Sequence, residues 1–284
     1  MKAIFYWCTY LLVYALSLLP MRVLYGVGYL IYLLSYYGTG YRKNVVIQNI
    51  ARAFPEKQYD EVRVVTRRFY RCFAAYLAEM VKSLSASPKR LERNVVVDNT
   101  ALIATYLNQG RHVIACSGHC ANWEVLNVLP RKLPGDIYAV YKPLKSRFAN
   151  QLMIKIRSRF GLKLVSDTSV IRHVRTPGGR PRLYLFLSDQ CPRQKDEQYN
   201  YAFLHQATYF FSGMERLARR TDSGVVYLNI TRRAKGKYTV VAKPICQSAS
   251  HTEPGQITQE YARLLAGNIN EQPHGWLWTH RRWK

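Results

Sequence analysis

The chain has 284 residues, of which 48% are hydrophobic, enough for one sizeable domain and a small appendage. Its 42 Lys and Arg against 17 Asp and Glu give a formal charge of +25, which indicates anionic partners: nucleic acid, an anionic membrane or negatively charged substrates. The basic residues are spread along the chain, which favours a charged face over a disordered nucleic-acid-binding arm.

The first forty residues are apolar enough to associate with a membrane. Ile4–Leu19 is uncharged and, as a helix, would span about 24 Å, short of the roughly 30 Å hydrocarbon core. Pro20 predicts a kink, after which Val23–Tyr37 is uncharged again. A cleavable signal peptide and a buried core helix are the alternatives, but no convincing cleavage site follows. We therefore predict an uncleaved membrane anchor or interfacial hairpin over residues 1–40, with the basic cluster 41–43 as its cytoplasmic flank.

The remaining residues, 41–284, are expected to form one domain. Between Asp60 and Leu84 the apolar positions step by three and four, which predicts a long amphipathic helix. After Pro88, short apolar runs alternate with helical periodicity, which indicates an α/β domain with a central, mainly parallel sheet flanked by helices. The predicted strands are Val95–Val97, His112–Cys116, Ile137–Tyr141, Leu162–Ser166, Leu183–Ser188, Val225–Ile230 and Tyr238–Ala242. The predicted helices are Thr100–Leu107, Trp123–Leu129, Phe148–Phe160 and Gly213–Arg220.

Polar residues follow two of these strands directly. Ligands of parallel sheets gather at the carboxyl ends of the strands. His119 comes just past the strand His112–Cys116, and Asp189 and Gln190 come just past Leu183–Ser188. No glycine-rich phosphate loop is visible, and Gly178-Gly179 is predicted to be a turn.

His119 and Glu124 are a base and an acid five residues apart. Neither a regular helix nor a regular strand brings them together, but a turn between strand and helix does. Gly118 permits such a turn, Asn122 is a good N-cap, and the helix dipole favours Glu124 in the first helical turn. A histidine oriented by a carboxylate is a general base near neutral pH. The alternative is a core histidine next to a surface glutamate.

A zinc site and a cysteine nucleophile are alternative interpretations of the same stretch. His112, Cys116, His119 and Cys120 are all ligand types, but no second ligand pair completes a known zinc spacing, so we predict no metal. Nothing marks Cys116 or Cys120 as a nucleophile rather than a small buried residue. The six cysteines lack a Cys-x2-Cys pair and are interpreted as reduced thiols in a cytosol-facing protein.

The residues around His119 also carry a family resemblance. Gly118-His119 followed by Asn122-Trp123-Glu124 resembles the GHxxNWE signature of the late acyltransferases of lipid A biosynthesis, the bacterial lauroyl/myristoyl transferase group within the glycerolipid acyltransferase superfamily. The similarity covers roughly residues 20–284, and Cys120-Ala121 replaces the more usual Phe-Gly. Other segments that agree are Arg42, Asn44, Asn49, 53–55, 141–143, Asn150–Arg157, Gly161, Asp189-Gln190, Gly213, 217–218 and Trp278–Lys284.

The resemblance implies a glycerolipid acyltransferase-like fold and transfer of a fatty acyl chain from a thioester to a hydroxyl of an anionic glycolipid, such as a lipid A precursor. It implies that His119 removes the proton from the acceptor hydroxyl and that Glu124 holds the other imidazole nitrogen. Backbone N–H groups near Asn122 are candidates for the oxyanion site. Residues expected to bind substrate are Asn122, Arg157, Asp189 and Gln190, and His280 is interpreted as structural.

The same resemblance implies an acyl carrier protein or acyl-coenzyme A as donor, with no cofactor beyond this thioester, and no nucleic acid. It implies a bacterial inner membrane location with the catalytic domain facing the cytoplasm. An acyltransferase for another lysolipid or aminolipid is an alternative. A membrane-tethered nucleic-acid-binding protein is an alternative of another class; it explains the charge and the 22 tyrosines but leaves His119 and Glu124 without a role.

Overall fold

The computed structural model describes residues 2–176, 180–192 and 194–283. The turn predicted at Gly178-Gly179 and the terminal Lys284 lie outside these ranges.

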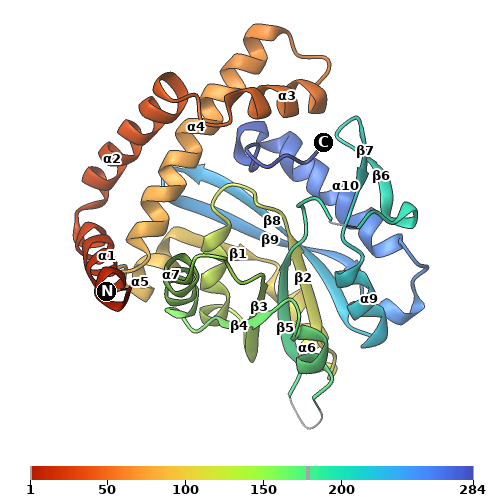
Figure 1. The fold of residues 1–284 in the computed structure, drawn as a ribbon. Coiled ribbons are helices and arrows are strands. Elements are labelled where there is room, and N and C mark those ends of the chain that lie inside the picture. The colour runs from red at the N-terminus through yellow and green to blue at the C-terminus, as the bar shows by residue number, and fades with distance from the viewer. Residues whose placement is uncertain (1, 177–179, 193, 284) are drawn as a thin grey trace.

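Seven strands form one sheet in the order β1-β9-β8-β2-β5-β3-β4 (Figure 1). Their bounds are β1 (Val95–Asp98), β2 (Val113–Ser117), β3 (Asp136–Tyr141), β4 (Lys163–Ser166), β5 (Arg182–Leu187), β8 (Gly224–Ala234) and β9 (Lys237–Cys246). β2 pairs in parallel with β5 and β8, β3 with β4 and β5, and β1 with β9, whereas β8 and β9 are antiparallel. The predicted mainly parallel sheet is confirmed, and each of the seven predicted strands overlaps an observed one.

Helices cover both faces of this sheet. They are α5 (Pro88–Asn94), α6 (Thr100–Asn108), the 3₁₀ helix η2 (Trp123–Arg131), α7 (Arg147–Ser158), α8 (Val170–Val174), α9 (Gly213–Arg220) and α10 (Gln256–Glu271). Ile114 and Cys116 of β2 join the apolar cluster that contains α9 and α10. Val113 and Ala115 join a second cluster with α6 and η2. β2 is buried along its whole length because both faces are covered, which explains its continuous apolar sequence.

A helical layer precedes the sheet. It consists of α1 (Lys2–Leu18), α2 (Met21–Leu33), the π-helical turn η1 (Leu34–Gly38), α3 (Lys43–Ala53) and α4 (Tyr59–Lys82). The long amphipathic helix predicted between Asp60 and Leu84 is α4. α2 lies along α4 (Figure 1), and Gly28 permits the close approach, since a Cβ there would lie 3.0 Å from the carbonyl oxygen of Ala74. Lys82 donates to the carbonyls of Ser17 and Leu19 at 2.8 and 3.0 Å, which joins the end of α1 to α4.

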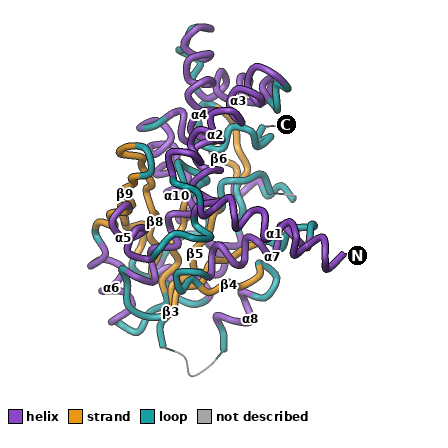
Figure 2. The backbone as a smooth tube through the Cα atoms, turned by 90° about the vertical axis from the view of Figure 1, so that its left-hand side faces the viewer, coloured by secondary structure: helices purple, strands orange, loops and turns teal. Residues whose placement is uncertain are grey.

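The kink predicted at Pro20 is confirmed, since the helical path bends by 117° between Trp7–Leu18 and Met21–Gly38. α1 extends away from the sheet with its N-terminal end outermost (Figure 2). Across the described residues, no single helix is long and apolar enough to cross a membrane; the bent pair Trp7–Leu18 and Met21–Gly38 meets that requirement together, by length and composition. Membrane association of residues 1–40 stays a prediction.

The C-terminal segment returns to the helical layer. After α10 and the short 3₁₀ turn η5 (Pro273–Gly275), the chain ends beside α3, as both views show (Figures 1 and 2). The side-chain amide of Asn49 in α3 donates to the carbonyls of Trp278 and His280 at 2.9 and 2.8 Å. A separate antiparallel hairpin, β6 (Asn200–Phe203) and β7 (Gln206–Tyr209), lies next to α10.

Candidate active site

The carboxyl ends of β2 and β5 bring two of the predicted site residues together. The strands are parallel neighbours, and Ser117 pairs with Leu187 at the end of their ladder. His119 and Asp189 each follow two residues later, so the two adjacent strand ends place their side chains next to each other. Gly118 leaves room between them, because a Cβ there would lie 3.4 Å from Asp189 Oδ2 and would collide with a buried leucine methyl group of α10.

Asp189 holds His119 through both carboxylate oxygens. Oδ1 lies 2.6 Å from His119 Nδ1, and Oδ2 accepts the backbone N–H of His119 at 2.8 Å and the indole N–H of Trp276 at 2.7 Å. The Asp189 side chain is 3% exposed. Burial alone raises its pKa, but the charge of His119 and these hydrogen bonds outweigh burial and lower the pKa to about 2. A carboxylate at Nδ1 selects the tautomer in which Nδ1 carries the proton and Nε2 is the basic nitrogen.

Glu124 has a different partner, Arg157 of α7. Arg157 Nη2 lies 2.7 Å from Oε1 and Nε lies 3.0 Å from Oε2, a bidentate ion pair in which Glu124 is 4% exposed. The predicted contact between His119 and Glu124 is therefore wrong. The positive φ of Ala121 (51°) turns the chain, and Asn122 Oδ1 accepts the N–H of Glu124 at 3.2 Å. The first turn of η2 therefore directs Glu124 to α7. The acid that contacts the imidazole is instead Asp189, which follows the neighbouring strand β5.

The other predicted substrate-binding residues lie close to this pair. Burial disfavours the charge of Arg157, but the carboxylate of Glu124 outweighs burial and raises the pKa of the guanidinium. Asn122 contacts Glu124 and also Glu79 of α4. Its Oδ1 accepts the backbone N–H of Glu124, and its side-chain amide donates to Glu79 Oε2 at 2.7 Å. Gln190 is partly exposed next to Asp189 at the same sheet edge. Substrate contacts of Asn122, Arg157, Asp189 and Gln190 stay predictions.

Glu79 of α4 was missed by the sequence reasoning. Its carboxylate accepts the hydroxyl of Tyr25 at 2.8 Å and that of Tyr238 at 2.6 Å, in addition to the amide of Asn122. Burial and the adjacent Glu79 charge raise the pKa of both tyrosines, so they are neutral donors. The sequence did contain a signal for this residue, because Glu79 is the one charged residue in the otherwise uncharged run Phe73–Val81.

The C-terminal segment also reaches the site, which the sequence did not indicate for Trp276. The carbonyl of Gly275 accepts the N–H of Ala121 at 2.7 Å, and the indole of Trp276 binds Asp189 as described. His280 Nε2 accepts the N–H of Cys191 at 3.1 Å, and burial lowers the pKa of His280. This contact agrees with the structural interpretation of His280.

The cysteines of the described chain are free. Burial raises the pKa of the Cys116 and Cys120 thiols far above neutrality, so neither is a thiolate. His112 lies at the opposite end of β2 from His119, and its Nδ1 accepts the N–H of Arg182 at 3.0 Å. Within residues 2–176, 180–192 and 194–283, no group of three or more His, Cys, Asp and Glu is arranged to hold a metal ion.

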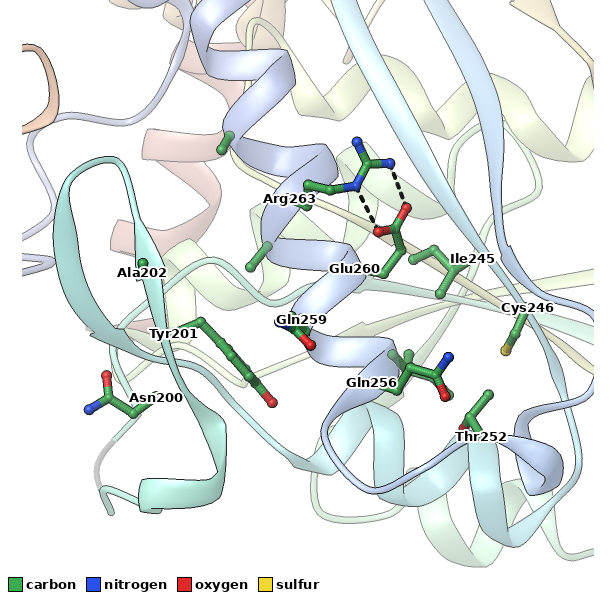
Figure 3. A pocket seen from close by; sticks show the side chains of 13 residues that line it. Asn200, Tyr201, Ala202, Ile245, Cys246, Thr252, Gln256, Gln259, Glu260 and Arg263 are labelled. Carbon is green, nitrogen blue, oxygen red and sulfur yellow. Dashed lines mark hydrogen bonds and ion pairs between the residues drawn. The ribbon is translucent and has the colours of Figure 1, made fainter.

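Two hollows differ in their relation to this site. A cavity of about 70 Å³ lies behind it, lined among others by Asn122, Glu124, Tyr25 and Lys82. A larger hollow of about 780 Å³ lies between β6, the end of β9 and α10 (Figure 3), where Glu260 and Arg263 form an ion pair. None of the predicted site residues lines this larger hollow, so volume alone does not identify the candidate site.

A family model described as bacterial lipid A biosynthesis acyltransferase matches residues 1–284, the whole chain. No curated protein matches the chain.

Proposed function

The chain belongs to the bacterial lipid A biosynthesis acyltransferase family, and we propose that it transfers a fatty acyl group from an acyl thioester to a hydroxyl of an anionic glycolipid such as a lipid A precursor. As a member of this family it is an O-acyltransferase, which leaves the nucleic-acid-binding alternative without support. The proposed donor is acyl carrier protein or acyl-coenzyme A, and the thioester is a co-substrate rather than a bound cofactor.

The observation that carries the mechanism is the 2.6 Å contact between His119 Nδ1 and Asp189 Oδ1. We assign Nε2 as the general base that takes the proton of the acceptor hydroxyl while its oxygen attacks the thioester carbonyl carbon. Asp189 stabilises the imidazolium that forms. The tetrahedral intermediate then expels the donor sulfur, and the proton on Nε2 passes to that sulfur, so that ester and free thiol are the products.

The oxyanion of this intermediate needs hydrogen-bond donors. At the turn after His119, the N–H of Ala121 is already used by Gly275 and that of Glu124 by Asn122. The N–H groups of Asn122 and Trp123, between these two, are our candidates for the oxyanion donors. In this proposal the Glu124–Arg157 ion pair fixes the start of η2 and thereby the direction of those two N–H groups.

The second part of the proposal is a lipid-facing surface on α1 and α2. Large apolar side chains on these helices are exposed to solvent, among them Leu11 (60%), Leu12 (62%), Leu18 (59%) and Leu30 (64%). Apolar patches of this kind are typical of membrane-contacting surfaces, and the positive charge of +25 favours an anionic bilayer and anionic substrates. We propose that the protein acts at the cytoplasmic side of the bacterial inner membrane.

The test is acyl transfer by the full chain in detergent or vesicles, with acyl carrier protein and coenzyme A thioesters offered separately and products identified by lipid mass spectrometry. His119→Ala should lower kcat by a factor of about 100 or more, and Asp189→Asn should cost far more than Glu124→Gln. His251→Ala, which changes an exposed histidine of the 3₁₀ turn Ala249–His251, is the matched control and should leave kcat unchanged. Near-normal turnover by His119→Ala would overturn the general-base assignment, and acylation of a lysophospholipid alone would overturn the glycolipid acceptor.

A further inference from the structure

The C-terminal segment contacts both halves of the proposed base. Through its backbone it joins the His119 loop, because the carbonyl of Gly275 accepts the N–H of Ala121 at 2.7 Å and Trp276 forms an antiparallel bridge with Cys120. Through its side chain it joins the loop after β5, because the indole N–H of Trp276 donates to Asp189 Oδ2 at 2.7 Å. One residue of the C-terminal segment therefore connects two strand ends of the sheet.

The indole bond differs from the other contacts of Asp189. Oδ1 faces His119 Nδ1, and Oδ2 accepts the backbone N–H of His119. Among the hydrogen bonds found for this carboxylate in the described residues, the one from Trp276 does not come from His119. Without it, the carboxylate would be oriented only by the residue that it has to orient.

We propose that Trp276 is a positioning residue for acyl transfer: its indole N–H fixes the Asp189 carboxylate, which in turn fixes the imidazole of His119. The inference rests on the proposed function. Trp276 is 2% exposed, so it acts through Asp189 and not by touching substrate. Its ring packs against other aromatic rings, at centroid distances of 5.9 Å from Phe203 and 6.0 Å from Trp283. A rigid donor of this kind keeps both carboxylate oxygens in place during turnover.

Trp278 provides a matched control. It is fully buried, packs edge-to-face on Trp276, and donates its indole N–H at 2.6 Å, but to the carbonyl of Pro273. Trp276→Phe and Trp278→Phe therefore remove similar volumes and one indole hydrogen bond each. They differ in the acceptor that is left behind, a carboxylate at the proposed base in one case and a backbone carbonyl in the other.

The experiment measures kcat, KM and melting temperature for the full chain and both variants in the same detergent. Loss of one positioning hydrogen bond should lower kcat of Trp276→Phe about tenfold with KM nearly unchanged, whereas Trp278→Phe should keep kcat at a similar melting temperature. Equal kcat values for the two variants, or a loss of kcat that follows melting temperature in both, would overturn the inference.

The pH dependence of kcat/KM separates positioning from general destabilisation. Asp189 loses a donor in Trp276→Phe, becomes a stronger acceptor and favours the imidazolium, so the acid limb should move to higher pH; it should not move in Trp278→Phe. Both variants retain the other titratable neighbours of Asp189, which are Cys120, Tyr227, Tyr261, His280 and Arg282. An unmoved limb in Trp276→Phe contradicts the inference. The proposed function has its own test: full turnover by His119→Ala would overturn the general-base assignment, whatever the result for Trp276→Phe.

Discussion

Arg157→Met should destabilise the protein through the acid that it leaves behind. The ion pair with Glu124 is buried, with side chains 23% and 4% exposed and a shortest contact of 2.7 Å. Methionine retains much of the aliphatic length of arginine but donates no hydrogen bond, so the buried carboxylate of Glu124 loses its partner. Removing one member of a buried pair costs about 3–5 kcal/mol, and we expect about 3 kcal/mol because the partial exposure of Arg157 admits water.

Thermal unfolding of the purified chain, followed by circular dichroism in one detergent, should show this loss as a decrease of roughly 5 °C in the midpoint. The double variant Glu124→Gln with Arg157→Met removes the charge as well and should unfold at a higher temperature than Arg157→Met alone. Arg147→Met, at an exposed position of the same helix, is the control and should leave the midpoint unchanged. If Arg157→Met and the double variant unfold at the same temperature, an unpaired buried charge is not the cause.

Two further predictions concern the strand ends. Asp189 has a pKa of about 2, below the unfolded value of about 3.9, so its carboxylate contributes about 2–3 kcal/mol above pH 4 that is lost as pH falls towards 2. In Asp189→Asn, the free energy of unfolding should therefore fall less steeply with pH between about pH 4 and pH 2. A slope equal to that of the unchanged protein would disagree with the low pKa of Asp189. Gly118→Ala should cost about 1–3 kcal/mol in urea unfolding, because the new methyl group meets buried Leu265. Gly267→Ala in α10, where a Cβ meets nothing within 4 Å, should instead stabilise by up to about 1 kcal/mol, and equal effects of the two alanines would refute the steric argument.

The main sheet could be predicted from the sequence because its strands are buried on both faces. Residues 113–117 are buried without exception, and 113–116 form a continuous apolar run that is followed by polar residues. α4 could be predicted because its apolar stripe has helical spacing and its first turn is acidic, with Gln58 and Glu61 forming a capping box. In both cases the signal is local to the element.

Other elements gave weaker signals. α10 places Ile257, Tyr261, Leu265 and Ile269 on one face at every fourth position, but it begins after Gly255 without a Ser, Thr, Asp or Asn cap. The hairpin β6–β7 turns at Leu204 and His205, which have positive φ values of 49° and 61°. Such turns usually contain Asn or Gly, so the turn chemistry gave no indication of a hairpin.

The candidate site shows where sequence reasoning ends. The position of polar residues after two strands predicts that His119 and Asp189 share one edge of the sheet. Which acid contacts the imidazole depends on strand order and register, here β2 next to β5 with Ser117 opposite Leu187, and neither is encoded in a five-residue spacing. An acid on the neighbouring strand end lies one strand spacing, about 5 Å, from the histidine whatever its distance along the chain.

The same geometry explains why the site contains two buried acids with different tasks. Asp189 is fixed by its hydrogen-bond donors, and its Oδ1 faces Nδ1 of His119. Glu124 is neutralised by the guanidinium of Arg157, which leaves little net charge to act on the imidazole but ties η2 to α7. The acid of the five-residue motif therefore orients the backbone of the turn, and the acid of the neighbouring strand orients the base. In the proposed reaction these two arrangements serve the groups that receive the proton and the oxyanion, which lie less than ten residues apart in the chain.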